Sequence, residues 1–280
     1  MVLNTGQKQH PEKLFSLDGE VAVVTGVLGK LGAIWAETLL EAGAVVFAID
    51  LPDVGLSEDF RKLQSRFEEM RLRLERADVT DRAALESVST KCLNSFGTPT
   101  ILVNNAGIDC PPDTLQKVFR LEDIPFEDSK RIIEVNTLGL FLVTQIFGSQ
   151  MVKAGRGSIV NIGSMYASIA PDARFYEHIQ SDPPFLKSPV YGASKAAVVN
   201  MTKYLATLWA SHGVRVNALS PGGVLNGQDE EFRRKFCDRV PLGRMASAKD
   251  LSGPLLFLAS DASSYVTGTE LIVDGGFTAW

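Results

Sequence analysis

The sequence has few of the residues that build disulfide or metal sites. Its 280 residues include only three cysteines, Cys92, Cys110 and Cys237, which lie far apart, and three scattered histidines. This odd and widely spaced set argues against a disulfide framework and against zinc-ligand pairs, and no HExxH-type pair occurs. We therefore expect no metal site. The cysteine usage fits a reducing compartment, so we predict a cytoplasmic location.

An excess of positive charge and long apolar runs are also missing. The net charge is -5, which argues against a nucleic-acid partner. Residues 1–20 are polar and lack the apolar centre of a signal peptide, and no stretch looks apolar for long enough to span a bilayer. We expect a soluble globular protein with a small-molecule substrate and with neither a nucleic-acid nor a membrane partner.

Apolar runs of strand length alternate with segments of helix length. Several runs are apolar at consecutive positions, as strands buried on both faces must be. The predicted strands are 21–24, 45–49, 72–77, 101–104, 158–162, 215–219 and 270–273. The predicted helices are 31–42, 57–70, 82–96, 126–151, 190–212 and 248–258. This alternation predicts an α/β fold with a parallel sheet between helices, in one domain over residues 1–280.

Two proline-rich segments interrupt this rhythm. Residues 110–125 contain three prolines, and residues 170–189 contain four prolines and three aromatics. Ligands of open α/β sheets bind beyond the carboxyl ends of the strands, and 170–189 follows a predicted strand. Long irregular loops in compact domains are mostly functional. We predict that 170–189 is a lid over a substrate and that residues 1–19 are an N-terminal extension.

The first predicted strand runs directly into a glycine-rich turn, TGVLGKLG. Gly26, Gly29 and Gly32 let the backbone fold tightly and approach a phosphate, and the next helix points its N-terminal amides at that anion. The second predicted strand ends at Asp50. A carboxylate there accepts hydrogen bonds from ribose hydroxyls and repels a 2′-phosphate, which favours NAD over NADP. Asp53 lies close enough in sequence to share this role.

One tyrosine has an unusual neighbour. Of the five tyrosines, only Tyr191 is followed four positions later by a lysine, Lys195. Residues four apart share a helix face, and an ammonium there favours the phenolate and lowers a pKa that is normally about 10. Such a tyrosine can donate a proton to a carbonyl or take one from an alcohol. The alternative is two amphipathic side chains with buried stems and solvated tips.

Eight ordered motifs resemble those of the short-chain dehydrogenase/reductase family, from Gly19 to Gly276. They are the glycine turn, DVTD (78–81), NNAG (104–107), Asn136 in EVNTLG, Ser164 in NIGS, YGASK (191–195), PGG (221–223) and VDGG (273–276). The resemblance implies a Rossmann-type doubly wound parallel sheet of about seven strands in the order 3-2-1-4-5-6-7. It also implies hydride transfer between nicotinamide and a secondary alcohol or ketone.

The resemblance also implies roles for individual residues. Tyr191 would be the acid/base, Lys195 would bind the nicotinamide ribose, Ser164 would hold the substrate oxygen, and Asn136 would position a water beside Lys195. The implied cofactor contacts are Gly26, Gly29, Leu31, Gly32, Asp50, Asp78, Val79, Asn105, Ala106, Gly107, Tyr191, Lys195, Pro221, Gly222 and Val224.

Some positions depart from the family pattern. Lys30 stands where many members have a glycine, and Asn226 stands where a threonine is common. Ser164 and Tyr191 are 27 positions apart, about twice the usual spacing, because residues 170–189 lie between them. Lys30 puts the geometry of the glycine turn in question, and Asn226 puts the contact with the nicotinamide in question.

The 170–189 region, residues 220–236 and the terminus DGGFTAW resemble a subgroup linked to sugar-acid oxidation and surface-sugar modification. This resemblance predicts a polyhydroxylated substrate. Arg174, His178 and Lys187 are candidates for meeting a carboxylate or phosphate on it, although solvation of a surface loop explains them equally well. The alternatives are a 3-oxoacyl thioester reductase, which usually prefers NADPH, and a catalytically silent nucleotide-binding or regulatory protein.

The predicted helix after Lys195 indicates self-association. Residues 196–210 are apolar nearly all round, so a second partner beyond the sheet is expected. In the family, this helix and the long one before the fifth strand form subunit interfaces. We predict a homotetramer or a homodimer.

Overall fold

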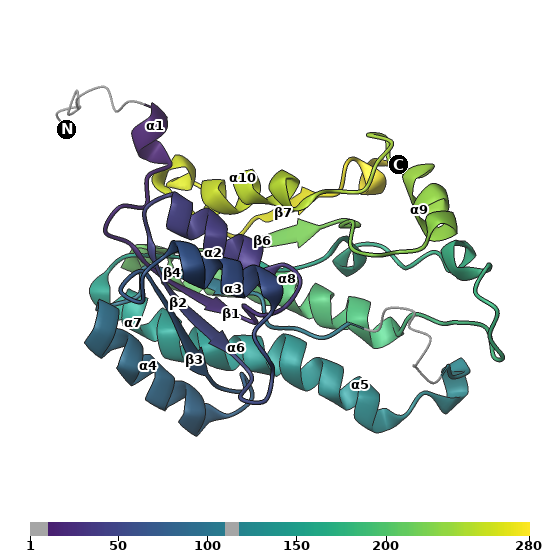
Figure 1. Cartoon of the computed structure of the whole chain (residues 1–280), viewed down its shortest axis with the longest axis horizontal. Helices are drawn as coiled ribbons and strands as arrows, with labels where there is room; N and C mark the ends of the chain where they lie inside the picture. Colours follow the sequence, from purple (N-terminus) through teal and green to yellow (C-terminus); the bar gives the residue numbers. More distant parts are fainter. Residues whose placement is uncertain (1–10, 110–117) are drawn as a thin grey trace.

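Seven parallel strands form one central sheet (Figure 1). The computed structural model describes residues 11–109 and 118–280. The strand order is β3-β2-β1-β4-β5-β6-β7, which confirms the predicted order. The strands are β1 (Val21–Thr25), β2 (Val45–Asp50), β3 (Leu72–Arg76), β4 (Ile101–Asn104), β5 (Gly157–Ile162), β6 (Val214–Pro221) and β7 (Glu270–Val273).

Helices cover both faces of this sheet, as predicted (Figure 1). One face packs on α2 (Gly32–Glu41), α3 (Glu58–Arg66) and α10 (Ala248–Ala259), with Trp35 and Phe60 fully buried between the layers. The other face packs on α4 (Arg82–Phe96), on the long helix before β5 (residues 126–154) and on α8 (Pro189–Trp209). Burial on both faces explains why the strands read as continuous apolar runs.

Local sequence fixes where several helices begin. Asp81 accepts a hydrogen bond from the backbone N–H of Ala84 at the start of α4, at 3.1 Å. Ser247 and Asp250 form a reciprocal capping box at the start of α10. Such caps satisfy amides that have no partner within the helix. Pro189 opens α8, where its missing N–H costs no hydrogen bond.

The long helix before β5 contains two wide turns of the π type. Its parts are α5 (Phe126–Ile133), a wide turn at Glu134–Gly139, α6 (Leu140–Val143), a second wide turn at Thr144–Gly148, and α7 (Ser149–Ala154). By length and composition the whole helix is apolar enough to cross a membrane, so our expectation that no stretch reaches that length is wrong by this criterion. Half of its most apolar window is buried inside the fold, as in a core helix.

One helix of eight residues was absent from the prediction. Helix α9 (Glu230–Cys237) begins at Asp229, which accepts a hydrogen bond from the backbone N–H of Phe232 at 2.8 Å. An acidic first turn and a basic last turn were readable signals for it. Between residue 170 and the start of α8 at Pro189, the only helical turn is a short 3₁₀ turn at Ala173–Tyr176. Cys110 lies outside the described residues.

Candidate active site

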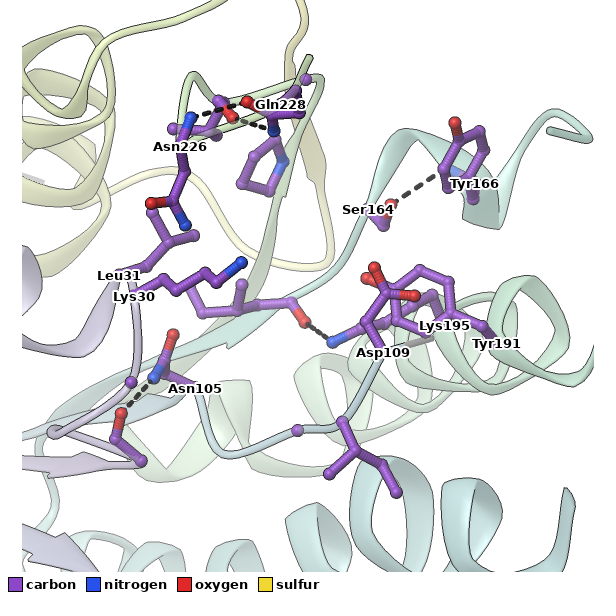
Figure 2. A pocket seen from close by; sticks show the side chains of 18 of the residues that line it. Lys30, Leu31, Asn105, Asp109, Ser164, Tyr166, Tyr191, Lys195, Asn226 and Gln228 are labelled. Carbon is purple, nitrogen blue, oxygen red and sulfur yellow. Dashed lines mark hydrogen bonds between the residues drawn. The ribbon is translucent and has the colours of Figure 1, made fainter. Parts of the chain in front are cut away.

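A cleft of about 1500 Å³ opens along the carboxyl edge of the sheet. One end, which we call the glycine-turn end, is lined by residues of the turn from Gly26 to Leu31 together with Asp50 and Asp78. The other, the tyrosine end, is lined by Asp109, Ser164, Tyr166, Tyr176, Phe185, Lys187, Tyr191 and Phe232. Figure 2 shows Lys30 and Leu31 on one side of the cleft and Asp109, Tyr191 and Lys195 on the other.

The cleft brings most of the sequence-predicted site residues together. Gly32 and Asn136 do not line it. Gly32 packs against Val27 behind the turn, and Asn136 lies beneath the cleft. The predicted residues that do line it are Gly26, Gly29, Leu31, Asp50, Asp78, Val79, Asn105, Ala106, Gly107, Ser164, Tyr191, Lys195, Pro221, Gly222 and Val224.

The glycine turn is clamped to the end of β4. Gly26 has a φ of +65°, and a Cβ on it would lie 2.7 Å from the Cα of Ala106, so only glycine fits there. The Asn105 amide donates to the backbone carbonyls of Thr25 at 3.0 Å and Gly26 at 2.9 Å. Trp35 donates its indole N–H to Oδ1 of Asn105 at 2.8 Å. Asn105 thus braces the turn, and no sequence motif indicated the role of Trp35.

The Asp50 carboxylate faces the glycine turn. It accepts the backbone N–H of Leu28 at 2.7 Å and that of Leu51 at 2.8 Å, and a carboxylate has further lone pairs for hydroxyl donors. Asp53, the alternative acid, is exposed and is not among the residues that line the cleft. The geometry therefore favours Asp50 as the acid at this position.

A second carboxylate, Asp78, lies further along the glycine-turn end. Its Oδ1 accepts the backbone N–H and the hydroxyl of Thr80, and its Oδ2 lies 3.2 Å from the Arg131 guanidinium. Although burial opposes ionisation, these hydrogen bonds and the Arg131 charge together lower the pKa of Asp78. Asp78 is therefore ionised at neutral pH and held in one orientation.

Tyr191 and Lys195 occupy the first turns of α8, as the sequence predicted. Lys195 is buried, and its Nζ donates to the carbonyl of Ile162 at 2.8 Å (Figure 2). The same Nζ lies 5.9 Å from the centre of the Tyr191 ring. Ser164 follows β5 and accepts the backbone N–H of Tyr166 at 3.2 Å. The three side chains thus converge at the tyrosine end.

The predicted direction of the Tyr191 pKa shift is wrong in this structure. Burial raises the pKa of Tyr191, the negative charge of Asp109 raises it further, and a hydrogen bond with Ser164 only partly opposes them. Burial also lowers the pKa of Lys195 to about 8. The sequence pattern identified the pair but carried no information on desolvation, which acts on both members here.

Asn136 lies in the first wide turn of the long helix. Its amide nitrogen donates to the carbonyl of Ile108 at 2.9 Å and to Oγ of Ser194 at 3.1 Å, and its Oδ1 accepts the N–H of Ile108 at 2.8 Å. Both amide hydrogens are therefore used, and Oδ1 keeps one lone pair for a further donor such as water. Wide turns of this type are frequent at functional sites.

Aromatic side chains fasten the 170–189 segment over the tyrosine end. The ring of Tyr176 lies 4.9 Å from that of Phe185 and 5.5 Å from that of Phe232 on α9, measured between ring centres. Phe175 packs 5.7 Å from Phe236 on the same helix. Helix α9 therefore supports this segment, which explains how a proline-rich stretch without regular structure is held in place.

Of the three basic residues proposed within this segment, only Lys187 lines the cleft. Its Nζ contacts both oxygens of Asp109, at 2.7 and 2.8 Å, and lies 5.2 Å from the centre of the Tyr191 ring. Arg174 points to Asp172, and Nε2 of His178 lies 2.8 Å from Asp229. No spacing rule in the sequence signalled that Asp109 would meet Lys187.

Gly107 leaves open space in the middle of the cleft lining. A Cβ on Gly107 would lie 3.2 Å from Oδ1 of Asn136 and 3.6 Å from Nζ of Lys195, so the absent side chain leaves a cradle between these groups. The glycine turn, Asp50 and Lys195 lie along one cleft, which fits a nucleotide at one end and its reactive ring at the other. Within residues 11–109 and 118–280, no cluster of His, Cys, Asp or Glu offers a metal site.

A family model described as enoyl-(acyl carrier protein) reductase, of the short-chain alcohol dehydrogenase type, matches residues 26–278. The chain belongs to the short-chain dehydrogenase/reductase family. It is an oxidoreductase of CH–OH groups. This short-chain dehydrogenase is 35% identical over 276 residues to galactitol 2-dehydrogenase from Rhizobium johnstonii, with 96% of this chain and 99% of the relative covered.

Two solved structures are similar over their full length. One is a gluconate 5-dehydrogenase from Burkholderia cenocepacia in complex with NADP and tartrate, with a TM-score of 0.81 and 31% identity, covering 97% of this chain and 100% of that one. The other is a short-chain dehydrogenase from Leptospira borgpetersenii with bound NAD+, with a TM-score of 0.80 and 31% identity, covering 99% of both chains. The fold of this short-chain dehydrogenase is thus shared with proteins that hold either dinucleotide.

Proposed function

We propose that this short-chain dehydrogenase transfers a hydride between NAD(H) and a secondary alcohol or ketone of a sugar or sugar-acid type substrate. The observation that carries this proposal is the convergence of Ser164, Tyr191 and Lys195 in one cleft that continues to the glycine turn. The names of the relatives support a polyol or sugar-acid substrate.

The preference for NAD over NADP rests on Asp50. Its carboxylate is held by two backbone amides at the glycine-turn end, where a ribose 2′-phosphate would meet its negative charge. One similar structure holds NADP and another holds NAD+, so the proposed preference for NAD rests on the residues of this chain and not on the comparison.

The chain's own contribution is proton handling and orientation. A bound nicotinamide would supply the hydride donor or acceptor. Burial keeps the Tyr191 hydroxyl protonated at neutral pH, so it is ready to donate its proton to a carbonyl oxygen. To take a proton from an alcohol in the reverse direction, it must first release its own proton toward solvent. Ser164 holds the same oxygen, and Lys195 binds the nicotinamide ribose. Asn136 offers one acceptor to a water that leads toward solvent.

Two alternative functions are distinguished by the experiment described below. The first is a 3-oxoacyl thioester reductase. The description of the matching family model names a reductase of a different acyl thioester, the enoyl form, and Asp50 argues against the NADPH that 3-oxoacyl reductases usually prefer. A catalytically silent nucleotide-binding protein would need no complete set of Asn136, Ser164, Tyr191 and Lys195.

The decisive experiment follows nicotinamide absorbance with polyols, aldonates and a 3-oxoacyl thioester, each with NAD(H) and NADP(H). We expect turnover with the polyhydroxylated compounds and NAD(H). Turnover restricted to the thioester would establish the reductase. NADH binding without turnover of any compound would establish the silent protein.

We also propose a homotetramer or homodimer. Apolar side chains are exposed along α8, at Tyr204 and Leu208, and on the neighbouring long helix, at Leu138 and Phe141, which fits faces that a second copy covers. A monomer mass in sedimentation would rule this out. The lid role of the 170–189 segment and the cytoplasmic location stay predictions.

A further inference from the structure

The charges at the tyrosine end bear on the class of substrate. Among the described residues, the basic side chains that line the cleft are Lys30, Arg131, Lys187 and Lys195. Lys30 and Arg131 belong to the glycine-turn end. Lys195 is buried, and the proposed function assigns it to the nicotinamide ribose. Lys187 is therefore the cation that a substrate carboxylate would have to use.

That cation is already engaged by a carboxylate. Both oxygens of Asp109 lie within 2.8 Å of Nζ of Lys187, and the lysine side chain is only 6% exposed. The Asp109 side chain is 41% exposed, so the negative partner of the pair is the one that faces the cleft. Asp229 adds a second carboxylate to the same lining. A substrate carboxylate entering here meets Lys187 already neutralised by Asp109, and among the described lining residues of this end the one other lysine is the buried Lys195.

An uncharged polyol and a sugar acid respond to this lining in opposite ways. An ionised carboxylate only accepts hydrogen bonds, so it pairs well with the hydroxyl donors of a polyol. A second carboxylate placed beside it is repelled, and repulsion of a competitor is a common means of specificity. Rings of Tyr166, Tyr176 and Phe185 supply the apolar walls typical of small-molecule sites.

We infer that the tyrosine end selects an uncharged polyol over the corresponding aldonate, and that Asp109 is the residue that enforces this choice by occupying Lys187. The inference rests on the proposed function and narrows its substrate class. Lys187, which the sequence suggested as a binding site for a substrate anion, is instead occupied by Asp109.

The test compares substrates that differ in one terminal group. Galactitol and D-galactonate form one pair, and D-glucitol and D-gluconate form another. For each pair, kcat/KM is measured with NAD at a single pH. We expect the native enzyme to favour the polyol by about tenfold or more, the effect expected for one unfavourable charged contact. The ratio within a pair cancels any change in the pKa of Tyr191, which is common to both substrates.

Variants then assign the preference. Asp109→Asn should shrink the polyol-to-aldonate ratio about tenfold by raising aldonate turnover, and adding Lys187→Met to that variant should remove the gain. Lys187→Met alone should widen the ratio. Glu177→Gln is the matched control, because it removes one negative charge from the exposed surface of the same segment, outside the cleft. It should leave the ratio unchanged.

The outcomes separate this inference from the proposed function. Turnover that favours the aldonates, or a ratio that Asp109→Asn leaves unaltered, overturns the inference and leaves the oxidoreductase function standing. Bound NADH with no turnover of any of the four sugars overturns both. A thermal unfolding curve shows whether Asp109→Asn folds. If it does not, the polyol-to-aldonate ratios of the native enzyme and of Lys187→Met still test the inference.

Discussion

The two ends of the cleft are built on different principles. At the glycine-turn end, side chains mostly hold backbone: Asn105 clamps Thr25 and Gly26, and Asp50 accepts the amides of Leu28 and Leu51. At the tyrosine end, side chains hold one another through the Lys187–Asp109 pair and a cluster of aromatic rings. The backbone contacts at the glycine-turn end suit a cofactor that is always the same. The side-chain contacts at the tyrosine end allow a single substitution to change the substrate preference.

The largest expected effect breaks the tyrosine end alone. Tyr191→Phe removes the proton donor and should lower kcat by about 10³ to 10⁴-fold, the upper range for acid–base catalysis. NADH affinity, measured by fluorescence titration, should change less than about twofold, because the hydroxyl donates to the substrate oxygen. Tyr265→Phe, at an exposed tyrosine outside the cleft, is the control. Normal turnover of Tyr191→Phe would remove the phenol from the mechanism.

The next effect concerns Lys195, which lies where the two ends meet. Its pKa of about 8 in the folded protein lies below the ordinary lysine value of 10.5, so between these pH values the unfolded chain binds more protons and stability rises with pH. The cost of burying the ammonium is fully present below pH 8 and is relieved toward pH 10.5. It amounts to about 3 kcal/mol.

Urea unfolding at pH 7.5, 8.5 and 9.5 measures this effect. Lys195→Met has no such titration, so the native protein should gain stability relative to the variant as the pH rises. The buried tyrosines and Cys92 are the same in both proteins, so their contributions cancel in the difference. A constant difference would mean that Lys195 keeps an ordinary pKa.

A smaller effect is expected from breaking the glycine-turn end. Gly26→Ala forces an L-residue to a φ of +65° and brings its Cβ against Ala106, at a cost of about 2 kcal/mol. NADH affinity should fall with stability. Gly19→Ala is matched, because Gly19 has a φ of +79° with open space around it. It should cost stability by backbone strain alone and leave NADH affinity intact. Equal NADH affinities in both variants would contradict the close approach.

The smallest effect sharpens the comparison by changing cofactor choice alone. Asp50→Ala should shift the NAD-to-NADP ratio of kcat/KM by about tenfold toward NADP, since a repulsive charge is removed. Asp53→Ala, which changes an exposed carboxylate outside the cleft, should not shift it. The polyol-to-aldonate ratio should stay constant in both. Equal shifts of the NAD-to-NADP ratio in the two variants would mean that the overall charge of the protein, and not Asp50 itself, sets the cofactor preference.

The sequence predicted the glycine-turn end better than the tyrosine end, for a physical reason. A tight turn requires glycine at position 26, and a buried parallel sheet requires apolar runs. Both requirements can be recognised in short stretches of the amino-acid sequence. The pairing of Asp109 with Lys187 depends on how a segment without regular structure folds back, which no spacing encodes. The pKa of Tyr191 was predicted in the wrong direction because burial depends on tertiary packing. Helix α9 was missed although its caps were readable.

The wide turn at Glu134–Gly139 has a consequence for how the long helix tolerates change. Each residue of a regular helix advances the side-chain direction by about 100°, and a π-type turn adds one residue without breaking the ladder. Deleting a single residue here would restore a regular helix and remove the widened backbone from which Asn136 reaches Ile108. The length of this segment is therefore as constrained as the identity of its residues.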